Sequence, residues 1–308
     1  MNELFDIPLY QRAILATLII GFVNGYASAF VLLHRSPLKL TALSHSLLPG
    51  VALAAYFVGL GVLSAFFGAV IAAVIFGVLT VLLSRVTKIS DDTVLAVLYT
   101  GAFAAGIMVL LKLGSNQDLE NWLLGNILGL SDFDLWMSFV VGIIAVALLS
   151  LFRRAIVIKL YDPEVAASLG IRTRLLEYAS FAVLILVLVT TLQAVGCILA
   201  IGMIVTPAAI VRPYISSPET LFPLSGLVGA AGSALGLYLN IHFDLPGAGA
   251  SIAATLAPCS SSLWSYVQFL RSRSQSLHQQ PIQQKTPPVS RSTENRLALA
   301  KLAVKFLE

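Results

Sequence analysis

The sequence predicts an all-α polytopic membrane protein with about nine transmembrane helices. Of its 308 residues, 58% are apolar and only 11% are charged, whereas a soluble domain carries about 25% charged residues. The mean hydropathy is +0.90. The apolar residues form runs of about 20, the length that a helix needs to cross a bilayer. The net charge of +4 is modest, and the basic residues gather in short loops, so no nucleic-acid partner is expected.

The apolar runs place the expected helices along the chain. The first run is too long for a cleaved signal peptide, so it is expected to remain as a span. The segment 176–211 is either one long tilted helix or two short helices that meet at Gln193–Gly196, which gives eight or nine spans in all. The spans are expected near residues 10–33, 41–59, 61–84, 93–112, 134–152, 176–193, 195–211, 221–240 and 248–270.

Loop charges decide between eight and nine spans, because short cytoplasmic loops carry an excess of Lys and Arg. Residues 113–133 contain three acidic residues and no basic residue. Splitting the segment 176–211 puts every basic loop on one side of the membrane. We therefore expect nine spans, with the N-terminus outside and the C-terminus inside. The basic residues concerned are Arg35, Lys39, Arg85, Lys88, Arg153, Arg154, Lys159, Arg172, Arg174, Arg212, Arg271 and Arg273.

A change of composition after residue 270 divides the chain into two parts. Residues 1–270 are expected to form the transmembrane domain, and residues 271–308 a cytoplasmic tail. Residues 272–296 are rich in Ser, Gln and Pro, which predicts disorder. Residues 293–308 regain a weak apolar helical period, which fits a short helix that binds the membrane surface or a partner; a dispensable tail is the favoured alternative.

Small residues in the span 221–240 predict close helix packing. Gly229, Gly232, Ser233 and Gly236 lie three or four residues apart, which places them on one helix face. Such faces let transmembrane helices approach closely in lipid, where no hydrophobic effect drives helices together.

His45 is the main candidate functional residue. It lies in the second apolar run, four residues before Pro49 and Gly50. A histidine at membrane depth costs free energy unless it finds a partner, so it is a candidate for a functional site. The alternative is that His45 lies near a helix end and forms a hydrogen bond to a carbonyl group or an interfacial water.

A second candidate lies at the centre of the basic loop 153–174. Asp162 before Pro163 is typical of an N-cap followed by the first helical position, and Glu164 adds negative charge to the first turn. Gly170 is placed to end the helix. We expect a capped helix of about two turns that suits the docking of a partner; a simple connector is the alternative.

Asn240, His242 and Asp244 form a third cluster, expected at an external loop. They could contact an arriving ion. Alternatively they are ordinary interfacial residues, with Asp244 capping the last span.

The sequence does not predict an enzyme. It contains no Gly-x-x-x-x-Gly-Lys-Ser/Thr phosphate loop and no motif for hydrolysis within the membrane. If the protein moves a substrate uphill with ATP, a separate chain must hydrolyse the ATP.

Seven short motifs, taken together, resemble the permease subunits of ABC importers for manganese, zinc and iron. They follow the family's order over roughly residues 10–270. The motifs are LSHSLLPGVALA (43–54), ISDDT (89–93), LGNILG (124–129), DPEVAASLG (162–170), QAVG (193–196), VTPAA (205–209) and DLP (244–246).

The resemblance implies ATP-driven import of a divalent transition metal ion by alternating access, in the plasma membrane of a prokaryote. It implies three partners: a cytoplasmic ATP-binding subunit, an external metal-binding protein and a second permease subunit, in a homodimer or heterodimer. No permanently bound cofactor is implied, because the ion is the transported substrate. The residues that match the family's ATPase-coupling segment are Asp162, Pro163, Glu164, Ala167, Leu169 and Gly170.

The resemblance also implies two ion ligands in the second span, an Asp and a His one helical turn apart. His45 matches the His, but Thr41 occupies the position of the Asp and Leu40 replaces the glycine before it. Positions i and i+4 share a helix face, so two facing subunits would present four ligands to one ion. A neutral hydroxyl in place of a carboxylate should disfavour Mn²⁺ more than Zn²⁺, which accepts imidazole readily.

Two other functions fit the same pattern. One is a similarly built permease for another small solute, such as a siderophore complex or a vitamin. The other is a carrier or channel that works without ATP.

Overall fold

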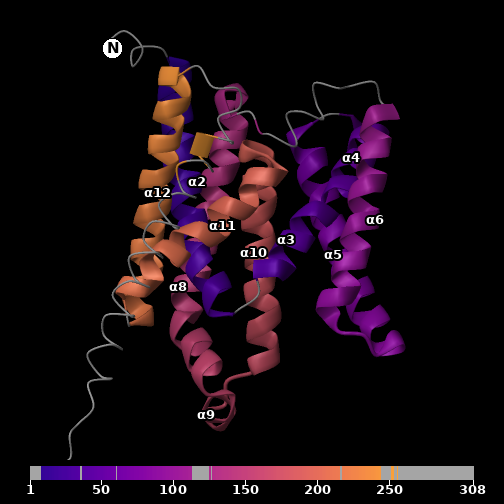
Figure 1. The fold of residues 1–308 in the computed structure, drawn as a ribbon, viewed down its shortest axis with the longest axis vertical. Coiled ribbons are helices and arrows are strands. Elements are labelled where there is room, and N and C mark those ends of the chain that lie inside the picture. Colours follow the sequence, from indigo (N-terminus) through magenta and orange to yellow (C-terminus); the bar gives the residue numbers. More distant parts are fainter. Residues whose placement is uncertain are drawn as a thin grey trace, which may run out of the picture. The chain divides into compact units, whose positions relative to one another are not determined.

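The computed structural model of the chain describes residues 8–34, 37–59, 61–112, 125, 127–215, 217–243, 251, 252 and 255. Within these residues it contains α-helices, two short 3-10 helices and no strand (Figure 1). The helices are α2 (Pro8–Leu33), α3 (Pro37–Ser46), α4 (Leu48–Val58), α5 (Val62–Thr87), α6 (Asp91–Lys112), η1 (Ile127–Gly129), α8 (Asp132–Tyr161), α9 (Pro163–Ser168), α10 (Thr173–Val195), α11 (Cys197–Val211), η2 (Arg212–Tyr214) and α12 (Pro218–Phe243).

Seven helical stretches of the described residues are long and apolar enough to cross a membrane. They are α2, α3 together with α4, α5, α6, α8, α10 and α12, whereas α11 is apolar but shorter. This confirms the predicted all-α polytopic class. The expected span 248–270 lies almost entirely outside the described residues, and the expected tail 271–308 lies wholly outside them. The count of nine spans therefore stays a prediction.

The fifth span is longer than expected. The sequence predicted residues 134–152, but α8 begins at Asp132 and continues to Tyr161. Ser131 caps its start, since its hydroxyl accepts a hydrogen bond from the Asp134 N–H and the Asp134 carboxylate accepts one from the Ser131 N–H. At the other end, hydropathy falls at Arg153 and Arg154, yet Arg is a good helix former and the backbone hydrogen bonds continue. The first part of the expected loop 153–174 is therefore helix.

The segment 176–211 forms two helices. This confirms the split at Gln193–Gly196 that the loop charges favoured. α10 ends at Val195 and α11 begins at Cys197, with Gly196 between them at a φ of +86°. This left-handed backbone region is open to glycine and costly for other residues. Gly125, at a φ of +80°, packs against this break, because a Cβ on Gly125 would lie 2.2 Å from the carbonyl oxygen of Val195. Two motifs distant in sequence thus meet here.

α2 and α12 pack side by side through small residues, as the sequence predicted for α12 (Figure 1). A Cβ on Gly229 would lie 2.3 Å from the carbonyl oxygen of Gly21, and one on Gly25 would lie 2.2 Å from that of Ser225. The two backbones are therefore in direct contact, and only glycine fits at these positions.

Gly25→Ala is expected to lower the free energy of unfolding by about 2 kcal/mol, because the added methyl group must separate α2 from α12. Thermal unfolding of the purified chain in detergent measures this. The matched control is Gly77→Ala in α5, whose Cβ would meet no atom within 4 Å. That variant should be unchanged or more stable, since Ala favours helix over Gly by up to about 1 kcal/mol. Equal losses in both variants would contradict the close contact.

Buried polar groups join α2 to α10 and α11. The Asn24 amide nitrogen donates to the Thr191 hydroxyl over 2.8 Å, and both residues are about 1% exposed. The Ser28 hydroxyl accepts a hydrogen bond of 3.0 Å from the Ala208 N–H. Pro207 interrupts the hydrogen-bonding pattern of α11 at this point. These bonds fix the central helices relative to α2.

Candidate functional site

α3 carries the candidate ion ligands and lies in the middle of the bundle. It packs against α5 and α6 on one side and against α10 and α11 on the other (Figure 1). α3 ends at Ser46 and α4 begins at Leu48, so the second predicted span is interrupted where the sequence places Pro49 and Gly50. Proline has no N–H to donate to the carbonyl oxygen of His45, four residues earlier. The interruption therefore lies directly beside the candidate histidine.

Thr41 and His45 occupy the open face of α3. Both are partly exposed, whereas every other side chain from Leu40 to Leu48 is buried. The neighbouring Ser44 and Ser46 hydroxyls point into the helix, where they donate to the carbonyl oxygens of Thr41 and Leu43 over 2.8 and 2.7 Å. The spacing of four residues thus places both candidate ligands on one face, as the sequence predicted.

Two aromatic side chains of α6 hold the His45 imidazole. Its ring stacks on Tyr99, with centroids 5.7 Å apart and planes 27° apart, and meets Phe103 edge-on at 4.9 Å. Sequence reasoning did not single out these two residues. Their spacing of four in an apolar span would be consistent with one face of α6, but nothing local indicates that this face meets α3.

Glycines on two neighbouring helices fix the interruption after His45. A Cβ on Gly68 of α5 would lie 2.5 Å from the carbonyl oxygen of Gly50, and one on Gly106 of α6 would lie 2.8 Å from the Pro49 nitrogen. Side chains larger than hydrogen would push α5 and α6 away. The close contacts hold the start of α4, directly after the interruption, in a defined position.

The described residues supply only part of a metal site at this position. Among the described residues, no three His, Cys, Asp or Glu side chains lie close enough to share an ion. The open face offers one imidazole and one neutral hydroxyl. Because transition-metal sites take about four or more ligands, an ion bound here needs ligands beyond these two described side chains.

The second candidate is the short helix α9, which joins α8 to α10 and packs against both. The Asp162 carboxylate caps it by accepting the N–H groups of Glu164 and Val165, each over 3.0 Å. Gly170, at a φ of +75°, ends the turn. The expected helix with both caps is confirmed.

α9 presents apolar side chains to its surroundings. Val165 is 46% exposed and Leu169 is 62% exposed, whereas Ala166 is fully buried beneath them. Asp162, Glu164, Ala167 and Gly170 are also exposed. Val165 and Leu169 lie beyond the membrane-spanning stretches of α8 and α10. Exposed apolar side chains outside the membrane can pack against a partner protein.

The third cluster is only partly within the described residues. Asn240 is 5% exposed, and its amide nitrogen donates to the Ser251 hydroxyl over 3.2 Å. His242 is exposed and stacks on Tyr238, with centroids 5.9 Å apart. Asp244 lies outside the described residues. The structure thus places Asn240 in the packing of the α12 end and His242 on its surface.

Comparison with known proteins agrees with these features. The family model described as the ABC 3 transport family matches residues 6–261. The manganese import system permease protein ScaB of Streptococcus gordonii is 34% identical over 261 residues, which are 83% of this chain and 91% of the relative. The chelated iron transport system membrane protein YfeD of Yersinia pestis is 30% identical over 244 residues, 79% of this chain and 81% of the relative.

A solved structure shows the same fold. It is PsaBC from Streptococcus pneumoniae in complex with Fab, with a TM-score of 0.79 and 30% sequence identity. The similarity covers 85% of this chain and 93% of the matched chain.

Proposed function

The chain belongs to the ABC 3 transport family, and from that membership we propose that it is the permease subunit through which a divalent transition metal ion is imported. It is a multi-pass plasma-membrane protein of a prokaryote, and its relatives support metal-ion import by an ABC permease. Their names favour Mn²⁺ or iron as the ion. The proposal further assigns the ion ligands, the partner proteins and the transport mechanism.

The open face of α3 is the observation that supports this function most. In the segment Leu40–Leu48, Thr41 and His45 are partly exposed and the other side chains are buried. Four helices pack around α3 here: α5, α6, α10 and α11. A histidine that packing alone required would be enclosed like its neighbours Ser44 and Ser46. Imidazole is a common ligand for transition metals. We therefore assign His45 as an ion ligand in the transport pathway.

A second permease subunit would complete the site. If two copies face each other across the pathway, their α3 helices bring two imidazoles and two hydroxyls to one ion. A non-identical subunit with a carboxylate would supply the charge that Thr41 lacks. This requirement for further ligands supports a dimer as the working unit.

A cytoplasmic ATP-binding subunit would dock on α9 and drive alternating access. The exposed apolar side chains of α9 support this assignment. Arg12 and Asp132, at the starts of α2 and α8, form an ion pair of 3.1 Å at the opposite end of α8 from α9. With α9 inside, the basic ends of α5 and α8 also lie inside, in accord with the positive-inside rule. An external metal-binding protein would deliver the ion on the other side, where His242 is an exposed candidate for first contact.

The proposal is tested by uptake of radioactive Mn²⁺ in cells that express the chain with its ATP-binding and metal-binding partners. Competition with Zn²⁺ and Fe²⁺ gives the preferred ion, and a hydrolysis-deficient ATP-binding subunit gives the dependence on ATP. Uptake that continues without ATP hydrolysis would indicate a carrier or channel. Competition by a siderophore complex but by none of the free ions would indicate a permease for another small solute.

Thr41→Asp is expected to shift the preference toward Mn²⁺, because a carboxylate supplies the charge that offsets dehydration of a hard ion. The measurement is the ratio of Mn²⁺ to Zn²⁺ uptake, expected to rise by roughly tenfold on the basis of about 1.4 kcal/mol of differential binding. Thr41→Asn is the matched control, with the same shape and no charge. An unchanged ratio in the Asp variant would mean that position 41 does not face the ion.

A further inference from the structure

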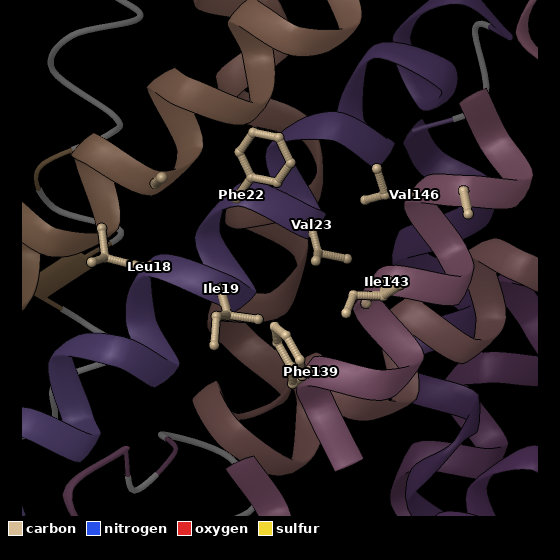
Figure 2. Close-up of a pocket in the computed structure, with 10 residues that line it drawn as sticks. Leu18, Ile19, Phe22, Val23, Phe139, Ile143 and Val146 are labelled. Atoms are coloured by element: carbon tan, nitrogen blue, oxygen red, sulfur yellow. The ribbon is translucent and has the colours of Figure 1, made fainter. Parts of the chain in front are cut away.

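An apolar groove on the face of α8 continues into polar and then basic residues along the same helix. The groove has a volume of about 560 Å³ and lies between α2, α8 and α12. Figure 2 shows Phe139, Ile143 and Val146 of α8 facing Ile19, Phe22 and Val23 of α2. Its lining is almost entirely carbon. Water has no hydrogen-bonding partners there, so at membrane depth the groove suits a hydrocarbon chain.

Beyond the groove, the same face of α8 carries a hydroxyl group, that of Ser150. Ser150 follows Val146 by four residues and therefore lies one helical turn farther along, at about 6 Å. Its side chain is exposed, and its hydroxyl shares a hydrogen bond of 2.6 Å with the Tyr26 hydroxyl of α2. The two hydroxyls form a polar step directly after the apolar lining.

One further turn along, the face ends in two arginines. Arg153 and Arg154 follow Ser150 by three and four residues, which places them on either side of the same face. The Arg153 Nη1 donates to the Glu219 carbonyl oxygen over 3.2 Å, while its Nε is buried without a hydrogen-bond partner among the described residues. Neither arginine forms an ion pair with a described carboxylate. Two positive charges thus lack a counter-charge in this part of the chain.

With Asp132 at the outer boundary of the hydrocarbon, the two arginines reach the depth of a lipid phosphate in the other leaflet. Asp132 begins α8, and Arg153 follows it by 21 residues, a rise of roughly 30 Å that matches the hydrocarbon thickness of a bilayer. The order along α8 is therefore carbon-lined groove, hydroxyls and cations. A phospholipid presents acyl chain, ester and phosphate groups in this same order.

We propose that this face binds one anionic phospholipid, with an acyl chain in the groove between α2, α8 and α12 and its phosphate at Arg153 and Arg154. An ester oxygen of the lipid accepts a hydrogen bond from the exposed Ser150 hydroxyl. With α9 on the cytoplasmic side, the lipid belongs to the inner leaflet, where short basic segments attract anionic headgroups. The binding does not depend on which solute the chain transports.

Spin-labelled lipids test the proposal with the full chain in phosphatidylcholine vesicles. The immobilised fraction in the spectrum is compared for phosphatidylglycerol and phosphatidylcholine carrying the same label. The wild-type chain should prefer phosphatidylglycerol, and Arg154→Gln should reduce this preference roughly fivefold, as expected for one cation near the membrane surface. Arg85→Gln is the control, since Arg85 is an exposed cation at the end of α5, a helix that contributes no residue to the groove. Equal binding of the two lipids, or equal loss in both variants, would overturn the proposal.

A second variant separates the groove from the charge. Ala147 is exposed and lines the groove, so Ala147→Phe fills it and should lower phosphatidylglycerol binding, whereas Ala104→Phe on the exposed face of α6 should not. If Ala147→Phe leaves lipid binding unchanged and instead prevents two copies of the chain from associating, a second copy covers this face and the lipid proposal is wrong.

Discussion

Replacement of His45 by alanine should reduce metal uptake to less than about a tenth of the wild-type rate, while the chain still inserts into the membrane. His45 supplies the imidazole on the open face of α3, and its loss removes one ligand from each subunit. Even the groups that only orient metal ligands cost 10- to 100-fold in affinity or activity when they are replaced, roughly speaking. Uptake of radioactive Mn²⁺, normalised to the amount of chain in the membrane, measures the effect.

Two further variants show whether the loss comes from the ligand or from packing. His45→Gln keeps a polar side chain that can still pack against Tyr99 and Phe103, but an amide is a poor ligand for these ions; it should lose uptake as well. Ser46→Ala changes a buried neighbour on the other side of α3 and should retain uptake. Normal uptake in His45→Ala would refute the assigned role.

Leu169→Glu should weaken the association of the chain with its ATP-binding subunit by roughly 30-fold or more. Leu169 directly follows α9 and is 62% exposed, and a charge there must be desolvated when a partner covers it. Truncation or charging of a central contact in a protein interface typically costs about 2 kcal/mol or more, which is roughly a 30-fold loss of affinity. Co-purification of the ATP-binding subunit with the tagged chain measures the association.

Leu175→Glu is the matched control for that experiment. Leu175 lies in the first turns of α10 and is 60% exposed, so the change adds the same charge at the same degree of exposure but outside α9. It should leave the ATP-binding subunit bound. Retention of the subunit by the Leu169→Glu chain, or its loss from both variants, would show that α9 is not the specific docking point.

Local signals in the sequence correctly predicted several interruptions and caps. Gly196 marked the break between α10 and α11, whereas the interruption between α3 and α4 beside Pro49 falls inside the expected span 41–59. Asp162 and Gly170 marked the two ends of α9. Each of these residues acts on its own backbone, through a missing N–H, a permitted positive φ or a side-chain acceptor, so its effect does not depend on distant parts of the chain.

Other features had no local signal. The sequence stopped the fifth span at residue 152, because hydropathy measures the preference for lipid and not the continuity of the helix that extends to Tyr161. It grouped Asn240 with His242 as surface candidates, whereas the Asn240 amide is buried against Ser251. It did not identify Asn24 and Thr191 as a hydrogen-bonded pair, since 167 residues separate them.

The sequence by itself determined that this chain is an all-helical membrane protein, that α10 and α11 are separate and α9 is capped at both ends, and that position 45 holds an imidazole one turn from a hydroxyl. In lipid, the backbone N–H and C=O groups must form hydrogen bonds within their own helix. The local sequence therefore decides these properties. Only the tertiary structure decided which face of α3 stays open and which aromatic rings hold His45. A span that is apolar on all sides carries no periodicity that distinguishes a face in contact with protein from one in contact with lipid, and the neighbours of each helix are therefore settled by packing alone.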